Sequence, residues 1–200
     1  AEVRIAEPAK YGMSLSVEDV DLAALLKAGR TGVKGPSDVQ GLLTGNLQMT
    51  GTVGNYKSRR ATGELRITRG KLYRLPVMMG FLHLVYLTLP SKSAFHSAEV
   101  NYTVRGNRMV FHEIHLQGST MSMVGAGRLD LKTDKLSLTF LGGPPRTLPR
   151  LAGLSDVLEG LASALTTWRI TGTIAKPRIR QVPLRNPDKT LWELYNPDAN

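Results

Sequence analysis

The sequence predicts a mainly β protein of the α+β class: one long, twisted antiparallel sheet with one apolar face, and about three amphipathic helices at its ends and edges. Two observations predict this. Apolar and polar residues alternate with a period of two along much of the chain, as in half-buried strands. Turn-forming pairs such as Gly106-Asn107 and Thr133-Asp134 separate these runs, so neighbouring strands are expected to pair as hairpins.

The strands follow from this alternation in chain order. In residues 41–53, every second position is apolar or glycine and most of the others are polar, which indicates a long strand with one buried face. Residues 61–69 repeat the pattern, with residues 55–60 expected as the turn between the two strands. The same reasoning predicts further strands over residues 98–104, 108–117, 121–131, 136–140 and 169–174.

Three helices are expected to interrupt the strands. Ser16 with Asp19 resembles a capping pair that opens a helix over residues 17–28, and Gly29 would end it. Pro76 opens a second helix over residues 76–87. The third covers residues 148–167, where leucines recur at steps of three and four up to Trp168.

The domain organisation follows from the same patterns. Residues 1–184 are interpreted as a single β domain, of which residues 1–40 form a strand and helix portion. The chain starts at Ala1, which suggests a processed or excerpted protein. Two Asn-Pro pairs, Asn186-Pro187 and Asn196-Pro197, indicate an extended C-terminal arm over residues 185–200, in which Trp192 and Tyr195 are the candidate docking side chains.

No motif indicates catalysis, a cofactor or a metal. The chain of 200 residues has no cysteine, which excludes a disulfide scaffold, a Cys–zinc site and a cysteine nucleophile. His112 and His115 would point to opposite faces of a regular strand and could not share one ion. No pair of carboxylates, nucleophile elbow or phosphate-binding loop is found. We therefore predict a protein that is not an enzyme.

The charge is strongly basic and unevenly distributed. The net charge is +10, yet residues 1–56 hold 5 basic and 6 acidic residues, whereas residues 57–200 hold 21 and 10. An anionic partner is plausible, and a solvated sheet face is the simpler alternative. Nucleic acid is not expected, because only Tyr73 interrupts the basic run with an aromatic ring. The candidates to meet phosphates or an acidic partner are Arg59, Arg60, Arg66, Arg69 and Lys71.

The apolar face of the predicted sheet has two interpretations. It could be an ordinary core, covered by the helices and by the curl of the sheet. It could instead remain partly open as a groove for acyl chains, because leucine, methionine and glycine make a smooth and adaptable surface. The candidate groove residues are Leu47, Met49, Val53, Leu65, Ile67, Met121, Met123, Leu129 and Leu138.

The order of several short motifs resembles the C-terminal region of AsmA-like proteins. The resemblance covers about residues 40–184. It begins with the Gly-Glu-Leu-Arg-Ile stretch at residues 63–67, followed by a Gly-Lys-Leu turn and a helix led by proline. It continues with a Gly-x-Gly-x-Leu-Asp-Leu strand at residues 125–131 and a Leu-Ser-Leu strand. A leucine-rich helix and a Gly-Thr-x-x-x-Pro strand at residues 172–177 close the region.

This resemblance implies a protein of the bacterial envelope. Larger members of the family resemble bridge-like lipid-transfer proteins, with a long bent sheet, a hydrophobic groove and a membrane anchor. The implied function is non-enzymatic phospholipid handling and outer-membrane homeostasis, in the periplasm or cell envelope, with membrane association through a segment outside this sequence. The implied partners are phospholipid acyl chains or a membrane surface. Other envelope proteins, or the rest of a longer chain, are further candidates. The alternative is a structural subunit of a larger envelope complex, whose basic face and C-terminal arm dock proteins.

Overall fold

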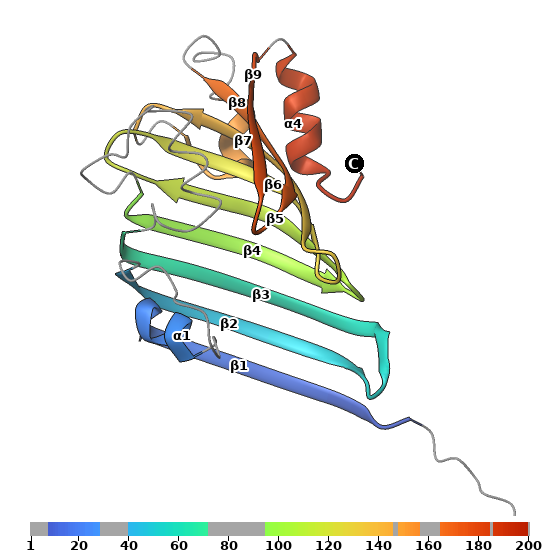
Figure 1. The fold of residues 1–200 in the computed structure, drawn as a ribbon. Helices are drawn as coiled ribbons and strands as arrows, with labels where there is room; N and C mark the ends of the chain where they lie inside the picture. The colour runs from blue at the N-terminus through green and yellow to red at the C-terminus, as the bar shows by residue number, and fades with distance from the viewer. Residues whose placement is uncertain are drawn as a thin grey trace, which may run out of the picture.

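The computed structural model describes residues 8–28, 40–71, 95–145, 148–156, 165–184 and 186–199, without the side chains of residues 26–28 and 71. Its centre is a single antiparallel sheet of nine strands, in which each strand pairs with the next in the chain (Figure 1). Among the described residues the sheet is not closed and 64% of them are in strands, so the predicted fold class is confirmed. The strands are β1 (Lys10–Asp21), β2 (Gln40–Thr52), β3 (Asn55–Lys71), β4 (Ser97–Arg105), β5 (Arg108–Gln117), β6 (Ser122–Asp130), β7 (Lys135–Gly143), β8 (Thr166–Thr173) and β9 (Pro177–Val182).

The N-terminal part of the chain belongs to the same sheet. Residues 17–21, predicted as helical, continue β1 and pair with β2; only Leu22–Ala28 form a helix, α1. Asp21 begins this helix, because its Oδ1 accepts hydrogen bonds from the backbone N–H groups of Ala23 (2.7 Å) and Ala24 (3.2 Å). The cap predicted at Ser16 is therefore wrong, since the helix begins five residues later.

Two other predicted boundaries are also wrong. Residues 55–60 are not a turn but the start of β3, since Gly54, with φ of +78°, makes the turn one residue earlier. Trp168 does not end a helix but lies in β8, where it pairs in register with Phe140. The chain enters this region through a short 3-10 turn, η2 (Leu151–Gly153). The helix predicted over residues 76–87 and the middle of the one predicted over residues 148–167 lie outside the described residues.

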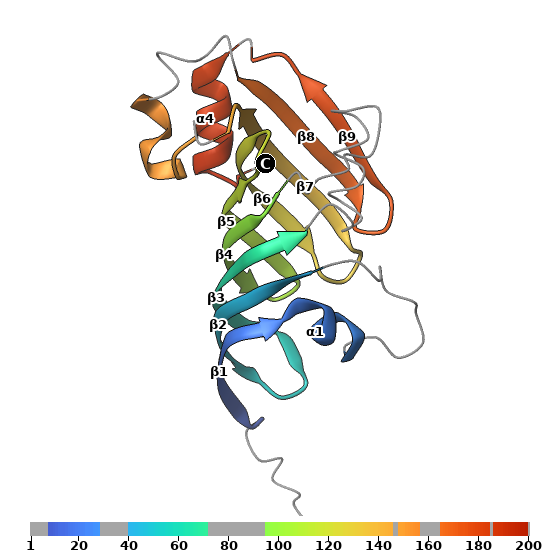
Figure 2. The same ribbon diagram turned by 90° about the vertical axis from the view of Figure 1, so that its left-hand side faces the viewer.

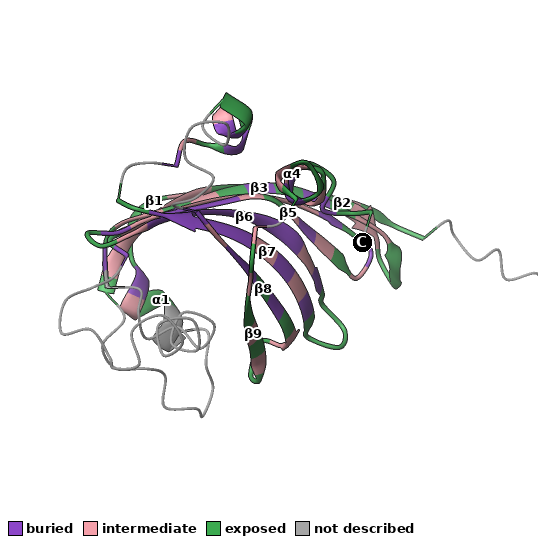
Figure 3. Cartoon of the chain, turned by 90° about the horizontal axis from the view of Figure 1, so that it is seen from above, coloured by how far each residue is buried: buried purple, intermediate pink, exposed green. Residues whose placement is uncertain are grey.

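The sheet twists and bends into an arch with two different faces (Figures 2 and 3). We call the inner side the concave face; its core cluster includes Ile114, Met123, Leu138 and Ile170, and α1 joins it through Leu22. We call the outer side the convex face. A second, smaller core forms there, where segments that follow β7 and β9 pack on β6 and β7; it consists of Val124, Ala126, Leu141, Leu148, Leu151, Leu154, Leu165 and Leu194.

The C-terminal segment is a helix and not an extended arm. Helix α4 (Pro187–Tyr195) begins at Asn186, whose side chain accepts a hydrogen bond from the backbone N–H of Lys189 (2.9 Å). Proline at the first helical position is a favourable start, so the Asn-Pro pair is a helix N-terminus signal. Leu194 is 1% exposed and packs in the convex core, while Arg169 on β8 donates to both carboxylate oxygens of Glu193 (2.6 and 2.7 Å).

Candidate functional site

The concave face carries four rows of mostly apolar residues that run across the strands. In an antiparallel sheet, residues paired in register point to the same face, so the register defines each row. One row begins at Leu15 and Leu47 and continues to Leu138 and Ile170. The three others begin at the paired residues Met13–Met49, Val17–Gly45 and Val20–Leu43. No residue assigned to these rows by the register is charged.

Exposure changes along these rows. Over β5–β8 the rows are core: Met123 is 1% exposed and Leu138 is 8% exposed. Over β1 the same rows are open to solvent, since Leu15 is 51% exposed and Met13 is 43% exposed. The apolar face therefore leaves the core at one end of the sheet and continues as an accessible surface.

The structure divides the predicted groove residues accordingly. Met123, Leu129 and Leu138 are buried in the concave core, and Met121 packs against that core. Leu47, Met49, Leu65 and Ile67 are half-buried on β2 and β3, and Val53 is exposed in the turn that joins these strands. The open end also includes Met13 and Leu15, which the sequence analysis missed. Their period-two alternation with Ser14 and Ser16 was a signal that could have found them.

The dimensions of the open end suit a hydrocarbon chain. Along β2, adjacent rows are two residues apart from Leu43 to Met49, so the four rows cover three steps, or about 20 Å at ~3.3 Å per residue. Half of a bilayer's hydrocarbon core is about 15 Å thick. Together, the four rows are therefore long enough, measured along the strands, to cover one acyl chain that lies parallel to the strands.

The predicted basic residues do not form one patch. Arg66 is paired with Glu99 at 3.1 Å. The Arg59 side chain donates to the backbone oxygen of Gly106 in the turn between β4 and β5 (2.6 and 2.9 Å). Arg69 is exposed near the end of β3 with φ of +50°, and the side chain of Lys71 lies outside the described residues. Among the described residues, no ion pair involves Arg60.

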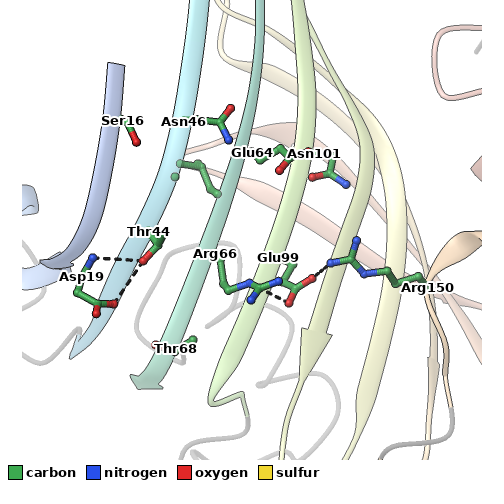
Figure 4. Close-up of a pocket in the computed structure, with 12 residues that line it drawn as sticks. Ser16, Asp19, Thr44, Asn46, Glu64, Arg66, Thr68, Glu99, Asn101 and Arg150 are labelled. Atoms are coloured by element: carbon green, nitrogen blue, oxygen red, sulfur yellow. Dashed lines mark hydrogen bonds and ion pairs between the residues drawn. The ribbon is translucent and has the colours of Figure 1, made fainter. Parts of the chain in front are cut away.

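A polar hollow of about 470 Å³ lies on the convex face over β1–β4 (Figure 4). Glu99 lies between Arg66 and Arg150 and forms an ion pair with each. Nearby, the Asp19 carboxylate accepts a hydrogen bond from the Thr44 hydroxyl (3.3 Å). Three of the five charged side chains that line the hollow are paired with one another, and the carboxylates of Asp19 and Glu64 leave the lining slightly acidic.

The two histidines of β5 each have a polar partner. A bulge between Phe111 and Ile114 breaks the alternation of the strand, so the argument that His112 and His115 occupy opposite faces is wrong. His112 Nε2 is 2.8 Å from the hydroxyl of Thr103, and the buried His115 Nε2 is 3.2 Å from the backbone oxygen of Leu148. In the part of the chain that the structure describes, no three metal-ligating side chains come together.

The docking candidates Trp192 and Tyr195 lie on α4. Trp192 is 51% exposed, so its ring is available on the surface of the convex face. The Tyr195 hydroxyl donates to the backbone oxygen of Leu151 (2.7 Å) and so fixes α4 to the segment that follows β7. One of the two predicted docking residues therefore also has an internal structural contact.

Replacing Leu194 by alanine should lower the free energy of unfolding by about 2–5 kcal/mol, because this side chain fills the core under α4. Replacing Trp192 should change it by less than about 1 kcal/mol, since half of its surface is already in solvent. Urea unfolding of both variants measures the difference. Equal effects would contradict the packing of α4 described above.

Comparisons with protein-family models, curated proteins and solved structures found no match. The resemblance to AsmA-like proteins therefore stays a prediction. No helix among the described residues combines the length and hydropathy needed to cross a membrane.

Proposed function

We propose that this chain is a non-enzymatic lipid-handling module of the bacterial envelope, which takes up phospholipid acyl chains on the open end of its concave face. One observation carries the proposal: apolar rows that form the core over β5–β8 continue without a charged residue onto β1, where Leu15 and Met13 face solvent. Large apolar patches left exposed on a folded protein commonly mark binding surfaces for apolar ligands or partners.

The shape of the face supports an acyl chain as the occupant. The surface extends about 20 Å along the strands, and its larger side chains are leucine, methionine, valine and isoleucine, with glycine and alanine between them. Methionine adapts to chains of different shape, and covering apolar surface contributes about 25 cal/mol per Å². The placement in the envelope rests on the resemblance of residues 40–184 to AsmA-like proteins.

The experiment is native mass spectrometry with lipid extraction on the purified chain, before and after incubation with phospholipid vesicles. We expect co-purifying or acquired phospholipid in the wild type. Leu15→Glu should reduce the retained lipid about tenfold, because a loss of ~1.4 kcal/mol already gives that factor. The matched control is Ser14→Glu, which places the same charge on the same strand but on the opposite face.

A structural role in a larger complex is the second candidate function. It is favoured by the burial of Met123, Leu129 and Leu138, which makes that part of the concave face an ordinary core. A lipid-free mass that does not change after vesicle incubation, for both the wild type and Leu15→Glu, would contradict lipid uptake and support this role.

A further inference from the structure

We propose a phosphate-binding site on the convex face, between Arg60 of β3 and Arg105 of β4. These arginines are directly paired in register on neighbouring strands. Their Cβ atoms are therefore about 5 Å apart on the same face. Two like charges in directly opposed positions destabilise a sheet. A bound anion would therefore stabilise this pair of arginines by offsetting their repulsion.

The described residues do not supply that anion. No described carboxylate forms an ion pair with Arg60 or Arg105. The next arginine in the row, Arg108, pairs in register with Arg105 but is already matched by Asp198 at 2.9 Å. No described carboxylate neutralises the charges of Arg60 and Arg105, so both charges are available to an external ligand.

Backbone contacts hold one of the two guanidinium groups in place. Nη1 of Arg60 donates to the backbone oxygens of Lys57 and Arg59, both at 2.9 Å. Its Nε and Nη2 have no hydrogen-bond partner among the described residues. A planar guanidinium with two free donors matches two oxygens of a phosphate group.

The surroundings provide further donors and room for a ligand. Arg60 and Arg105 line a hollow of about 300 Å³ together with three threonines, of which Thr50 and Thr62 can offer their hydroxyl groups, whereas the hydroxyl of Thr103 is hydrogen-bonded to His112. Because a tetrahedral phosphate offers more acceptor oxygens than a carboxylate, it can use both arginines and the hydroxyls at once. The volume accommodates a phosphate with an organic substituent. The ligand class is therefore a phosphate ester, either free in solution or in a lipid headgroup.

This site is independent of the lipid-handling function proposed above, because it lies on the opposite face of the sheet. Glu64, the nearest acidic residue of β3 on this face, lines the other convex hollow. The Leu15→Glu variant should therefore bind phosphate as the wild type does, and the failure of one proposal leaves the other standing.

Calorimetric titration with inorganic phosphate at constant ionic strength tests the site. We expect saturable binding to the wild type, and affinity at least about tenfold lower for Arg60→Gln and Arg105→Gln. The matched control is Arg178→Gln, which removes the same charge from an exposed position on β9 and should bind normally. Equal binding by all four proteins, or an equal loss in the control, would overturn the proposal.

A second variant and a second assay complete the test. Arg105→Lys retains the charge but not the planar donors, so it should bind more weakly than wild type even if Arg105→Gln fails to fold. Flotation with phosphatidylcholine vesicles containing phosphatidic acid distinguishes the two sources. Arginine-dependent flotation identifies a lipid headgroup, whereas phosphate binding without flotation identifies a soluble phosphate ester. Wild-type affinity in a folded Arg105→Lys would contradict a contribution of the planar donors of Arg105 to the site.

Discussion

Replacing Gly127 by alanine is expected to prevent stable folding, or to lower the free energy of unfolding by at least about 3 kcal/mol. This glycine is buried in β6 and has φ of +153°, a conformation that residues with a side chain rarely adopt. A Cβ atom at this position would collide with the backbone oxygen of Ser137 and would lie 2.7 Å from Cα of Leu138. Both neighbours are main-chain atoms of β7, so only a shift of the strand could relieve the contact.

Gly12→Ala is the matched control for this prediction. Gly12 lies in the edge strand β1, where an added Cβ would meet no atom within 4 Å. Alanine there should leave stability unchanged or raise it slightly, because it restricts the unfolded chain. Urea unfolding followed by circular dichroism measures both variants. A Gly127→Ala protein as stable as Gly12→Ala would show that β6 and β7 are not as close as described.

The sequence predicted the central strands well, because there one physical signal dominates. In β4 and β7 apolar and more polar positions alternate along the chain, and β5 was predicted with its observed bounds although a bulge interrupts its alternation. The signal failed where two patterns compete. Residues 17–28 satisfy both a strand and a helix period, and pairing with β2 decides in favour of the strand up to Asp21. Trp168 extends a helical leucine pattern, yet its ring is needed beside Phe140 in the core.

The candidate site was less predictable, since it depends on register and coverage. The alternation identifies which residues share the concave face, but core and open surface have the same residue pattern. Whether Met123 is buried and Leu15 exposed depends on what packs over each strand. The pairing of Arg60 with Arg105 joins residues 45 positions apart, so no local pattern could indicate it. In the same way, a strict period of two does not predict the bulge that brings His112 and His115 to one face.

Replacing Leu138 by glutamate is expected to lower the free energy of unfolding by at least about 4 kcal/mol at pH 7. Leu138 lies among the buried side chains of the concave core, beside Leu136 and Ile170. A carboxylate at this position would lose its water without gaining a partner, and an isolated buried charge costs several kcal/mol. Burial would raise the pKa of the new carboxyl group above its unfolded value, so the folded protein would bind the proton more tightly than the unfolded chain.

The pH dependence of this variant distinguishes a buried charge from a simple loss of packing. The penalty is full above the raised pKa and shrinks as pH falls from that pKa towards the unfolded value of about 4.3, because in this range the folded protein binds a proton that the unfolded chain does not. The stability difference from wild type should therefore be smaller at pH 5 than at pH 7. Leu15→Glu is the matched control: its site is exposed, so its effect should stay within about 1 kcal/mol and vary little with pH. Similar effects at the two positions would mean that the apolar face has one environment from β1 to β8. The distinction between a filled core and an open end, on which acyl-chain binding depends, would then be lost.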